Sequence, residues 1–205
     1  MSARGKFVTL EGVDGAGKSS HIEFIADAVR AGGAQHVIVT REPGGTDLAE
    51  RLRQAILSEP MSPLLETLLI FAARTDHVDR VIRSALEGGT SVVCDRFSDA
   101  TAAYQGAGKG VPADLIERLS KAAHPGLAPD RTLVFDCPYD VSRRRLEQIG
   151  RQLDRFERED AAFFERVRHA YVGRAKAEPA RMRIIDASRD FENVRKQIQQ
   201  ALAGL

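Results

Sequence analysis

The stretch Gly12-Val13-Asp14-Gly15-Ala16-Gly17-Lys18-Ser19 decides the fold, because it matches the pattern G-x-x-x-x-G-K-[ST] at every fixed position. It follows the apolar run 7–10 and precedes Ile22, Ile25 and Val29, which recur at helical spacing. A loop between a strand and a helix can turn its backbone N–H groups and the helix N-terminus toward a phosphate. A flexible glycine-rich turn with an unrelated lysine is the alternative, and this context disfavours it. Phosphate contacts are expected from Gly12, Val13, Asp14, Gly15, Ala16, Gly17, Lys18, Ser19 and Ser20.

Three side chains of this loop are expected to have different roles. Lys18 is expected to reach the outer phosphates, and the Ser19 hydroxyl is expected to bind Mg²⁺. Asp14 is unusual in a phosphate-binding loop, because its carboxylate repels phosphate unless it points elsewhere or shares the metal. Asp14 therefore has a separate role, or it is a plain loop acid in solvent.

Composition restricts the class of protein and its partners. A chain of 205 residues can bury one core, and no linker is evident, so residues 1–205 are expected to form a single domain. Lys and Arg number 30 against 29 Asp and Glu, so no global field favours a nucleic acid or a membrane. No apolar stretch reaches membrane length, and the five His lack zinc-ligand spacing. Two Cys without a secretory leader favour the cytoplasm.

Short β-branched runs alternate with longer segments of helical period along the chain. The runs lie at 7–11, 37–40, 91–95, 132–136 and 183–186, and each reads as apolar on both faces. This order predicts an α/β three-layer sandwich: a five-stranded parallel sheet with helices on both faces. The segment 64–86 has a broad apolar stripe, which predicts one long helix that buries two sides and meets a partner. The aromatic residues of 164–171 and 191–202 are expected in the core.

Several arginines follow the carboxyl ends of these strands or begin helices. Open α/β sheets bind ligands at that edge, where Glu11, Asp95 and Asp136 also lie. Planar guanidinium groups match phosphate oxygens, so their convergence predicts a second anion beside the first. Surface solubility is the alternative for any one of them. The convergent set is Arg41, Arg53, Arg74 and Arg96.

Further motifs connect the chain to a known family. They are Thr40-Arg41-Glu42-Pro43-Gly44-Gly45-Thr46, Phe71-Ala72-Ala73-Arg74, Asp95-Arg96-Phe97, Ala103-Tyr104-Gln105-Gly106 and Leu153-Asp154-Arg155. With the phosphate-binding loop they resemble bacterial thymidylate kinase over nearly the whole chain. The resemblance implies a P-loop nucleoside monophosphate kinase fold, a short mobile lid at about 148–157, ATP with Mg²⁺, conversion of dTMP to dTDP, and a homodimer. A kinase for another nucleoside monophosphate is the nearest alternative. An ATP-binding switch that transfers no phosphate to a small molecule is a further one.

The resemblance also assigns the dTMP-binding residues. Phe71 and Arg74 share a helix face, so Phe71 is expected to stack on the base and Arg74 to donate to a ring carbonyl. Thr101 and Gln105 are expected at the polar edge of the base. Tyr104 is expected beside the sugar, where it would crowd a 2′-hydroxyl.

The resemblance places the remaining acceptor contacts around the phosphate. Asp14 is implied to accept a hydrogen bond from the 3′-hydroxyl. Arg53 and Arg96 are implied to bind the dTMP phosphate, and Glu42 with Pro43 would shape the turn that holds them. Asp95 would steady Mg²⁺ through water.

Catalysis is expected to need no general base, because the acceptor phosphate has a second pKa of about 6 and is largely dianionic at neutral pH. Charge neutralisation is then assigned to Lys18, Asp95 with Mg²⁺, Arg96 and the lid arginines Arg151 and Arg155. The resemblance does not say which lid arginine acts. For adenine it points to Arg143 and to the turn after the last strand at Ala187.

Overall fold

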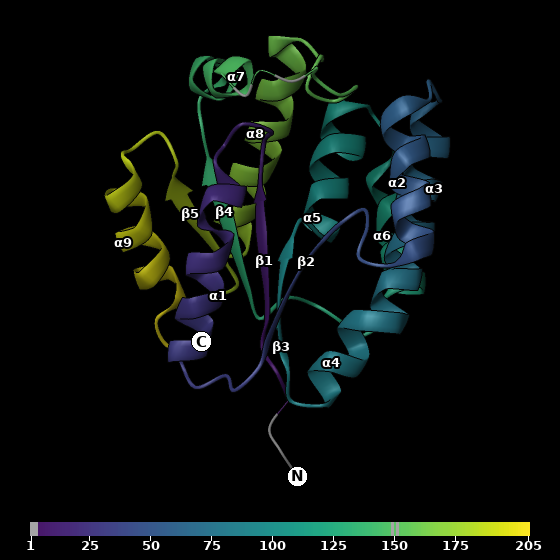
Figure 1. The fold of residues 1–205 in the computed structure, drawn as a ribbon. Helices are drawn as coiled ribbons and strands as arrows, with labels where there is room; N and C mark the ends of the chain where they lie inside the picture. The colour runs from purple at the N-terminus through teal and green to yellow at the C-terminus, as the bar shows by residue number, and fades with distance from the viewer. Residues whose placement is uncertain (1–3, 149, 151) are drawn as a thin grey trace.

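The computed structural model describes residues 4–148, 150 and 152–205 and contains one five-stranded parallel sheet (Figure 1). The strands are β1 (Phe7–Gly12), β2 (Val37–Arg41), β3 (Ser91–Asp95), β4 (Arg131–Asp136) and β5 (Met182–Asp186). Their order across the sheet is β2-β3-β1-β4-β5, and every neighbouring pair is parallel. The predicted strands are confirmed, each with its ends within one residue.

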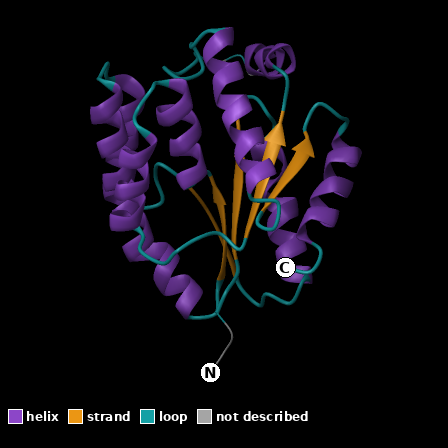
Figure 2. Cartoon of the chain, turned by 180° about the vertical axis from the view of Figure 1, so that it is seen from behind, coloured by secondary structure: helices purple, strands orange, loops and turns teal. Residues whose placement is uncertain are grey.

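Helices cover both faces of this sheet. On one face α1 (Ile22–Ala31) packs against β2, β3 and α9 (Phe191–Leu202), and α9 also contacts β4 and β5. On the other face α8 (Ala161–Ala177) crosses β1, β4 and β5, as the view from behind in Figure 2 shows. The predicted three-layer sandwich is therefore confirmed, with Leu10, Ile25 and Ile198 fully buried in its core.

The outer strands differ from the prediction that every strand is buried on both faces. The strands β1, β3 and β4 are buried almost throughout, but Ile38 of β2 and Ile184 of β5 are 36% and 42% exposed. Both strands lie at the edges of the sheet. Burial on two faces holds only for the three central strands.

Further helices and irregular helical segments connect these layers. They are a 3₁₀ turn (Lys18–His21), α2 (Asp47–Ser58), α5 (Ser98–Thr101), a π-helical segment (Ala102–Gly108), α6 (Ala113–Ala123), α7 (Tyr139–Gln148), and the pieces of the 64–86 region. None of the described helices is long and apolar enough to cross a membrane.

The helix predicted over 64–86 is interrupted. It consists of α3 (Pro63–His77), a π-helical turn (Val78–Ile82) and α4 (Arg83–Glu87), and it begins at Ser62, whose hydroxyl accepts from the Leu65 N–H. In its later turns Val78, Ile82 and Leu86 are buried, and of these only Ile82 belongs to the predicted apolar stripe. The first turns behave differently: the leucines there face solvent, whereas Glu66 and Thr67 are fully buried. The exposed leucines are Leu64 (49%), Leu65 (48%) and Leu68 (44%).

One predicted core aromatic lies at the surface. Phe164 and Tyr171 of α8 are buried as expected, but Phe191 at the start of α9 is 44% exposed. Its ring stacks on His21, with 4.4 Å between ring centroids. The helical period placed it correctly on the inner face, but the first residue of α9 lies beyond the edge of the core. Cys94 and Cys137 are buried free thiols.

The phosphate-binding loop passes so close to its neighbours that two of its glycines cannot be replaced freely. Gly12 has φ +136°, and a Cβ there would lie 2.5 Å from the Phe135 carbonyl oxygen. Gly15 has φ +76°, and a Cβ there would lie 2.4 Å from the Ser142 carbonyl oxygen of α7. The glycine spacing of the motif therefore allows the loop to fit between β4 and α7.

Replacement of Gly15 by Ala should be more destabilising than the same change at Gly33. Gly33 also has positive φ, at +108°, but a Cβ at Gly33 would meet no atom within 4 Å. Gly33→Ala should lower the free energy of unfolding by about 1 kcal/mol through backbone strain alone. Gly15→Ala adds a backbone clash and should cost about 2–4 kcal/mol. Urea unfolding measures both, and equal losses would contradict the packing argument.

Candidate active site

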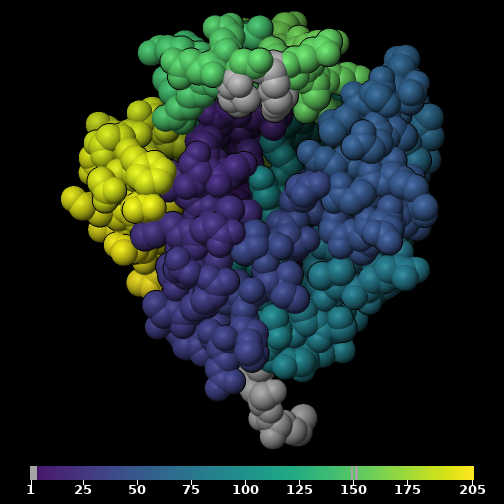
Figure 3. All heavy atoms as spheres, in the orientation of Figure 1, coloured from purple at the N-terminus to yellow at the C-terminus, as the bar shows by residue number. Residues whose placement is uncertain are grey.

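Two adjoining cavities lie at the carboxyl edge of the sheet. Figure 3 shows the surface hollowed between the purple phosphate loop, the blue side formed by α2 and α3, and the green segment above. One cavity follows the phosphate loop, and the other lies between α3, α5 and the π-helical segment 102–108. After the ligands that the sequence predicts for them, we call them the phosphate cavity and the acceptor cavity. The residues that line both are Asp14, Glu42, Arg53, Arg96 and Asp154.

The loop residues divide between the phosphate cavity and the core. Those lining the cavity are Asp14, Gly15, Gly17, Lys18, Ser19 and Ser20. Val13 and Ala16 are buried in the core behind them, so their side chains do not face the cavity. The Lys18 ammonium donates to the carbonyl oxygens of Gly12 and Val13, at 3.1 Å each. Burial lowers the pKa of Lys18, and the nearby Arg96 lowers it further.

Asp95, at the end of β3, has a buried carboxylate oxygen that no described side chain or backbone group satisfies. Its Oδ1 has no hydrogen-bond partner, and the residue lines the phosphate cavity with Ser19. A carboxylate and a hydroxyl are oxygen donors of the kind that Mg²⁺ prefers. The two residues therefore fit a magnesium site.

Arg96 connects the phosphate loop to the acceptor cavity. Its Nη2 donates to Asp14 Oδ1 at 2.7 Å, and its Nη1 donates to the Gly12 carbonyl oxygen at 3.0 Å. The Tyr104 hydroxyl donates to Asp14 Oδ2 at 2.8 Å, and the guanidinium carbon lies 4.7 Å from the centroid of that ring. Burial alone would raise the pKa of Asp14, but Arg96 and Lys18 hold it below its ordinary value. Asp14 is thus an ion-paired carboxylate, which explains why an acid belongs in this loop.

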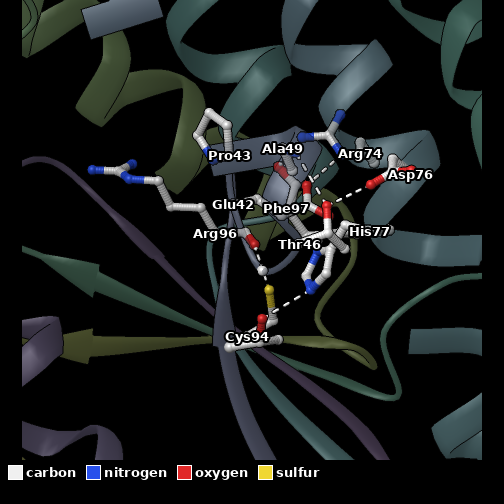
Figure 4. A network of polar contacts seen from close by, with 12 residues as sticks. Glu42, Pro43, Thr46, Ala49, Arg74, Asp76, His77, Cys94, Arg96 and Phe97 are labelled. Carbon is white, nitrogen blue, oxygen red and sulfur yellow. Dashed lines mark hydrogen bonds and ion pairs between the residues drawn. The ribbon is translucent and has the colours of Figure 1, made fainter. Parts of the chain in front are cut away.

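Arg74 is held by a buried network (Figure 4). Its Nε donates to Glu42 Oε2 at 2.6 Å, and its Nη2 donates to the Phe97 carbonyl oxygen and to Thr101 Oγ1 at 3.1 and 3.0 Å. His77 Nδ1 donates to the other oxygen of Glu42 at 3.0 Å. The buried Nη1 of Arg74 has no hydrogen-bond partner among the described residues, and Arg74 lines the acceptor cavity. Arg74 is therefore a fixed donor with one position left for a ligand.

The same network gives Glu42 a role beyond the turn expected of it. Its two carboxylate oxygens accept hydrogen bonds from Arg74 and His77, so Glu42 positions Arg74. Burial alone would raise the pKa of Glu42, but Arg74 and His77 hold it below its ordinary value. No motif in the sequence pointed to His77, whose Nε2 also bonds to Thr40 Oγ1 at 2.8 Å.

Phe71 does not line the acceptor cavity, contrary to the prediction that it stacks on a base. It packs with Val111, Ile116 and Ala123, and its ring centroid lies 4.9 Å from the Arg74 guanidinium carbon. Ile70, one residue earlier, lines the cavity instead. The predicted shared face of Phe71 and Arg74 is confirmed, but the ring supports Arg74 from the side of the core.

The remaining acceptor residues line this cavity as expected. Thr101 accepts from Arg74, and Gln105 Nε2 donates to Glu66 at 2.8 Å. Arg53 donates from Nη1 to the Pro43 carbonyl oxygen at 3.0 Å, so the arginine is hydrogen-bonded to this turn. The residues of the prediction that line the acceptor cavity are Asp14, Glu42, Pro43, Arg53, Arg74, Arg96, Thr101, Tyr104 and Gln105.

Of the two lid arginines, Arg151 lies outside the described residues, and Arg155 lies elsewhere than expected. Arg155 donates to Glu66 and to the Ile56 carbonyl oxygen, so its guanidinium lies against α2 and α3. Among the described residues that line the phosphate cavity are Arg41, Arg53, Arg96 and Arg145, but not Arg155. In this structure Arg155 does not lie over the phosphate loop.

Arg145, which sequence reasoning missed, lies at the outer end of the phosphate loop. It donates to the Ala16 carbonyl oxygen at 3.3 Å and to the Ala187 carbonyl oxygen at 3.0 Å. Arg145, Ala187 and His21 line a further pocket there. Arg143, the predicted residue, instead bonds to Glu147 and to the Glu157 carbonyl oxygen. Two residues apart on α7, the two arginines face different directions, and the helical period alone does not say which one faces the loop.

Comparison with known proteins identifies the family. Residues 10–198 match the thymidylate kinase family. The chain belongs to this family. It is 55% identical to the thymidylate kinase of Bordetella petrii over 205 residues, which covers 100% of this chain and 98% of that protein. It is 52% identical to that of Methylobacillus flagellatus over 195 residues, 95% of each chain. The crystal structure of thymidylate kinase from Ehrlichia chaffeensis aligns with a TM-score of 0.78 at 30% identity, over 97% of this chain and 99% of that one.

In this member of the thymidylate kinase family, a buried acid lies beneath the site. Glu11, at the end of β1, is fully buried and accepts hydrogen bonds from the Phe97 N–H at 2.7 Å and the Tyr171 hydroxyl at 2.9 Å. Burial, with a contribution from Asp99, raises the pKa of Glu11 to about 8. Glu11 therefore connects β1 to the Asp95–Phe97 turn and to α8, below Arg96.

The raised pKa of Glu11 predicts a pH-dependent stability. Between the ordinary pKa of 4.5 and about 8, the folded chain binds a proton at Glu11 that the unfolded chain releases. Protonated Glu11 therefore adds to the free energy of unfolding. This stabilisation is complete below pH 4.5 and is lost as the pH rises to about 8. The difference in the free energy of unfolding between wild type and Glu11→Gln should therefore shrink with rising pH, by up to about 1.4 kcal/mol per pH unit. Urea unfolding from about pH 5 to about pH 8.5 measures it, and a constant difference would contradict the assignment.

Proposed function

We infer that this chain transfers the γ-phosphoryl group of ATP to dTMP, giving dTDP and ADP. The observation that supports this function best is the adjacency of the two cavities, which share Asp14, Arg53 and Arg96. Two phosphate-bearing ligands can then lie end to end, with their facing phosphates at the shared residues. A nucleotide switch needs only the phosphate cavity, so it leaves the acceptor cavity unexplained.

The ATP side of the site is formed by the phosphate loop and its outer pocket. Lys18 and the loop N–H groups bind the polyphosphate, and the pocket of Arg145, Ala187 and His21 receives the adenine. Ser19 and Asp95 would hold Mg²⁺, which supplies positive charge against the β- and γ-phosphates when bound. The unpartnered Oδ1 of Asp95 supports this assignment.

The dTMP side uses the fixed donors of the acceptor cavity. Arg53 and Arg96 bind the acceptor phosphate, and Asp14 accepts from the 3′-hydroxyl. The free Nη1 of Arg74 donates to a carbonyl oxygen of the base, near Thr101 and Gln105, while Ile70 supplies the apolar wall. Tyr104, held by its hydroxyl on Asp14, lies beside the sugar and disfavours a 2′-hydroxyl.

The transfer itself requires alignment and charge neutralisation. An oxygen of the dTMP phosphate forms the new bond to the γ-phosphorus, and the bond to the β–γ bridging oxygen breaks, which releases ADP. The acceptor is a dianion near neutral pH, so no side chain has to remove a proton. Lys18 exchanges its hydrogen bonds to backbone carbonyl oxygens for contacts with the outer phosphates. Arg96, which is held by its ion pair with Asp14, binds the acceptor phosphate. Because both cavities lie at one edge of the same sheet, we propose that residues 1–205 form a single domain.

The exposed leucines of α3 support a homodimer. Leu64, Leu65 and Leu68 face outward together, and Leu48 of the adjacent α2 is also 41% exposed. The segment was expected to meet a partner because its apolar stripe is too wide for one contact. A second copy of this helical face covers these side chains symmetrically.

A substrate panel tests the proposed reaction. With ATP and Mg²⁺, dTMP should give dTDP, and dUMP should have a kcat/KM lower by roughly 10 to 200-fold, because one methyl group in an apolar pocket contributes about 1–3 kcal/mol. The nucleotides dCMP and AMP should react poorly. A coupled assay for ADP measures all four, and Lys18→Ala controls for contaminating kinases. Preference for another nucleoside monophosphate, or tight ATP binding without dTDP, would reject the assignment.

The dimer has a separate test. Leu68→Glu places a charge in the outward leucine face and should convert a dimer of about twice 22.5 kDa into a monomer. Ile184→Glu is the matched control, since Ile184 is similarly exposed but lies on the edge strand β5. Light scattering distinguishes the two masses. A wild-type monomer, or a dimer that persists in Leu68→Glu, would exclude this interface.

A further inference from the structure

A buried carboxylate outside the groups assigned to the reaction joins three elements around the acceptor cavity. Glu66 of α3 is fully buried, although the leucines next to it face solvent. Its Oε1 accepts from Gln105 Nε2, and its Oε2 accepts from Lys109 Nζ, at 2.8 Å each. Arg155 Nη2 also donates to Oε2. A buried carboxylate is stable only with such partners, so these contacts explain why Glu66 faces inward.

Arg155 uses two anchors on the wall of the cavity. It lies in residues 152–159, which we call the roof segment. Besides its bond to Glu66 on α3, its Nε and Nη2 donate to the Ile56 carbonyl oxygen on α2, at 3.2 and 2.7 Å. The guanidinium carbon also lies 4.9 Å from the centroid of the Phe156 ring. A planar guanidinium suits this double contact, because its donors point in fixed directions.

The roof segment in turn encloses the acceptor cavity. Asp154 and Phe156, on either side of Arg155 in the sequence, both line that cavity. Asp154 Oδ1 accepts from the N–H groups of Phe156 and Glu157, at 2.9 and 3.0 Å, which fixes the segment as a tight turn. Lys109 Nζ lies 4.4 Å from the Phe156 ring centroid. The hydrogen bonds of Arg155 to α2 and α3 therefore fix the position of Phe156 at the cavity.

We propose that Glu66 and Arg155 are positioning residues whose ion pair is a latch, holding the roof segment closed over the acceptor cavity. The contact of Glu66 with Gln105 ties this closure to the wall that faces the base. The proposal rests on the proposed function, since dTMP is the ligand that the closed cavity holds. A closed roof keeps dTMP bound and keeps water from the γ-phosphoryl group. Arg155 acts through the roof and does not touch the transferred phosphoryl group.

Steady-state kinetics of the full chain separates a latch from a catalytic arginine. Arg155→Met should raise the KM for dTMP about tenfold and leave kcat within about threefold, because it weakens closure and leaves the reacting groups in place. ADP should then form in excess over dTDP, since water reaches ATP. Arg155→Lys keeps the charge toward Glu66 and should recover part of the dTMP affinity. Arg158→Met is the matched control: Arg158 is exposed on the same segment, its Nε donates to the Leu153 carbonyl oxygen, and its loss should change neither quantity.

A double-mutant cycle tests the pair itself. Glu66→Gln should raise the KM for dTMP at least as much as Arg155→Met does, because it also alters the contacts with Gln105 and Lys109. Arg155→Met added to Glu66→Gln should raise the KM little further, because the contact between the two residues is already lost. Thermal unfolding checks that each variant is folded. If Glu66→Gln does not fold, the Arg155 series and its control decide the question without it.

Three results would overturn the latch. A fall in kcat of about 10³-fold or more for Arg155→Met, at unchanged KM for dTMP, would show that Arg155 neutralises charge on the transferred group. An unchanged KM and kcat would show that closure does not depend on it. Multiplicative effects of the two substitutions would show that they act separately. Failure of the proposed function is distinguishable, because wild type would then make no dTDP.

Discussion

The ion pair between Arg96 and Asp14 is the interaction on which the site depends. It joins the phosphate loop to the β3–α5 turn, where Arg96 has a positive φ of 71° that is unusual for a residue with a side chain. Strain of this kind persists only where the surroundings hold the residue in place. Here Asp14, the Gly12 carbonyl oxygen and the Tyr104 ring fix the guanidinium. Asp14 and Arg96 line both cavities, so the pair lies where the phosphate cavity and the acceptor cavity adjoin.

Buried charge in this molecule fixes the directions of the Arg74 and Arg96 guanidinium groups. Glu42 holds Arg74 and is itself held by His77, while the buried Nη1 of Arg74 has no hydrogen-bond partner among the described residues. Breaking such a network leaves an uncompensated buried charge, so each member constrains the others. These side chains are therefore ordered during folding, and binding requires little further ordering of them.

The fold and the convergence of Asp14, Arg53 and Arg96 at one sheet edge were predictable from the sequence, because both follow from local rules. Strand alternation, the glycine loop and residues at strand ends translate directly into positions at one sheet edge. Predictions that depended on the direction of one side chain were less successful. Phe71 and Ile70 are adjacent on α3, and Arg143 and Arg145 are two residues apart on α7, so a rotation of about 100–200° decides which of each pair faces a cavity. That rotation is set by packing against distant elements, which a single sequence does not reveal.

Arg155 presents a harder case, in which a charged residue has two possible partners. An arginine beside a glycine-containing hinge suits a mobile catalytic group, and the sequence supported that interpretation. A second signal was present in Glu66, an acid between leucines in a segment expected to be buried, which requires a cation nearby. The need of this buried acid for a cation explains the position of Arg155 without any ligand. The position of an arginine in the sequence says only that it can bind an anion, and a carboxylate of the same chain satisfies that requirement as well as a phosphate.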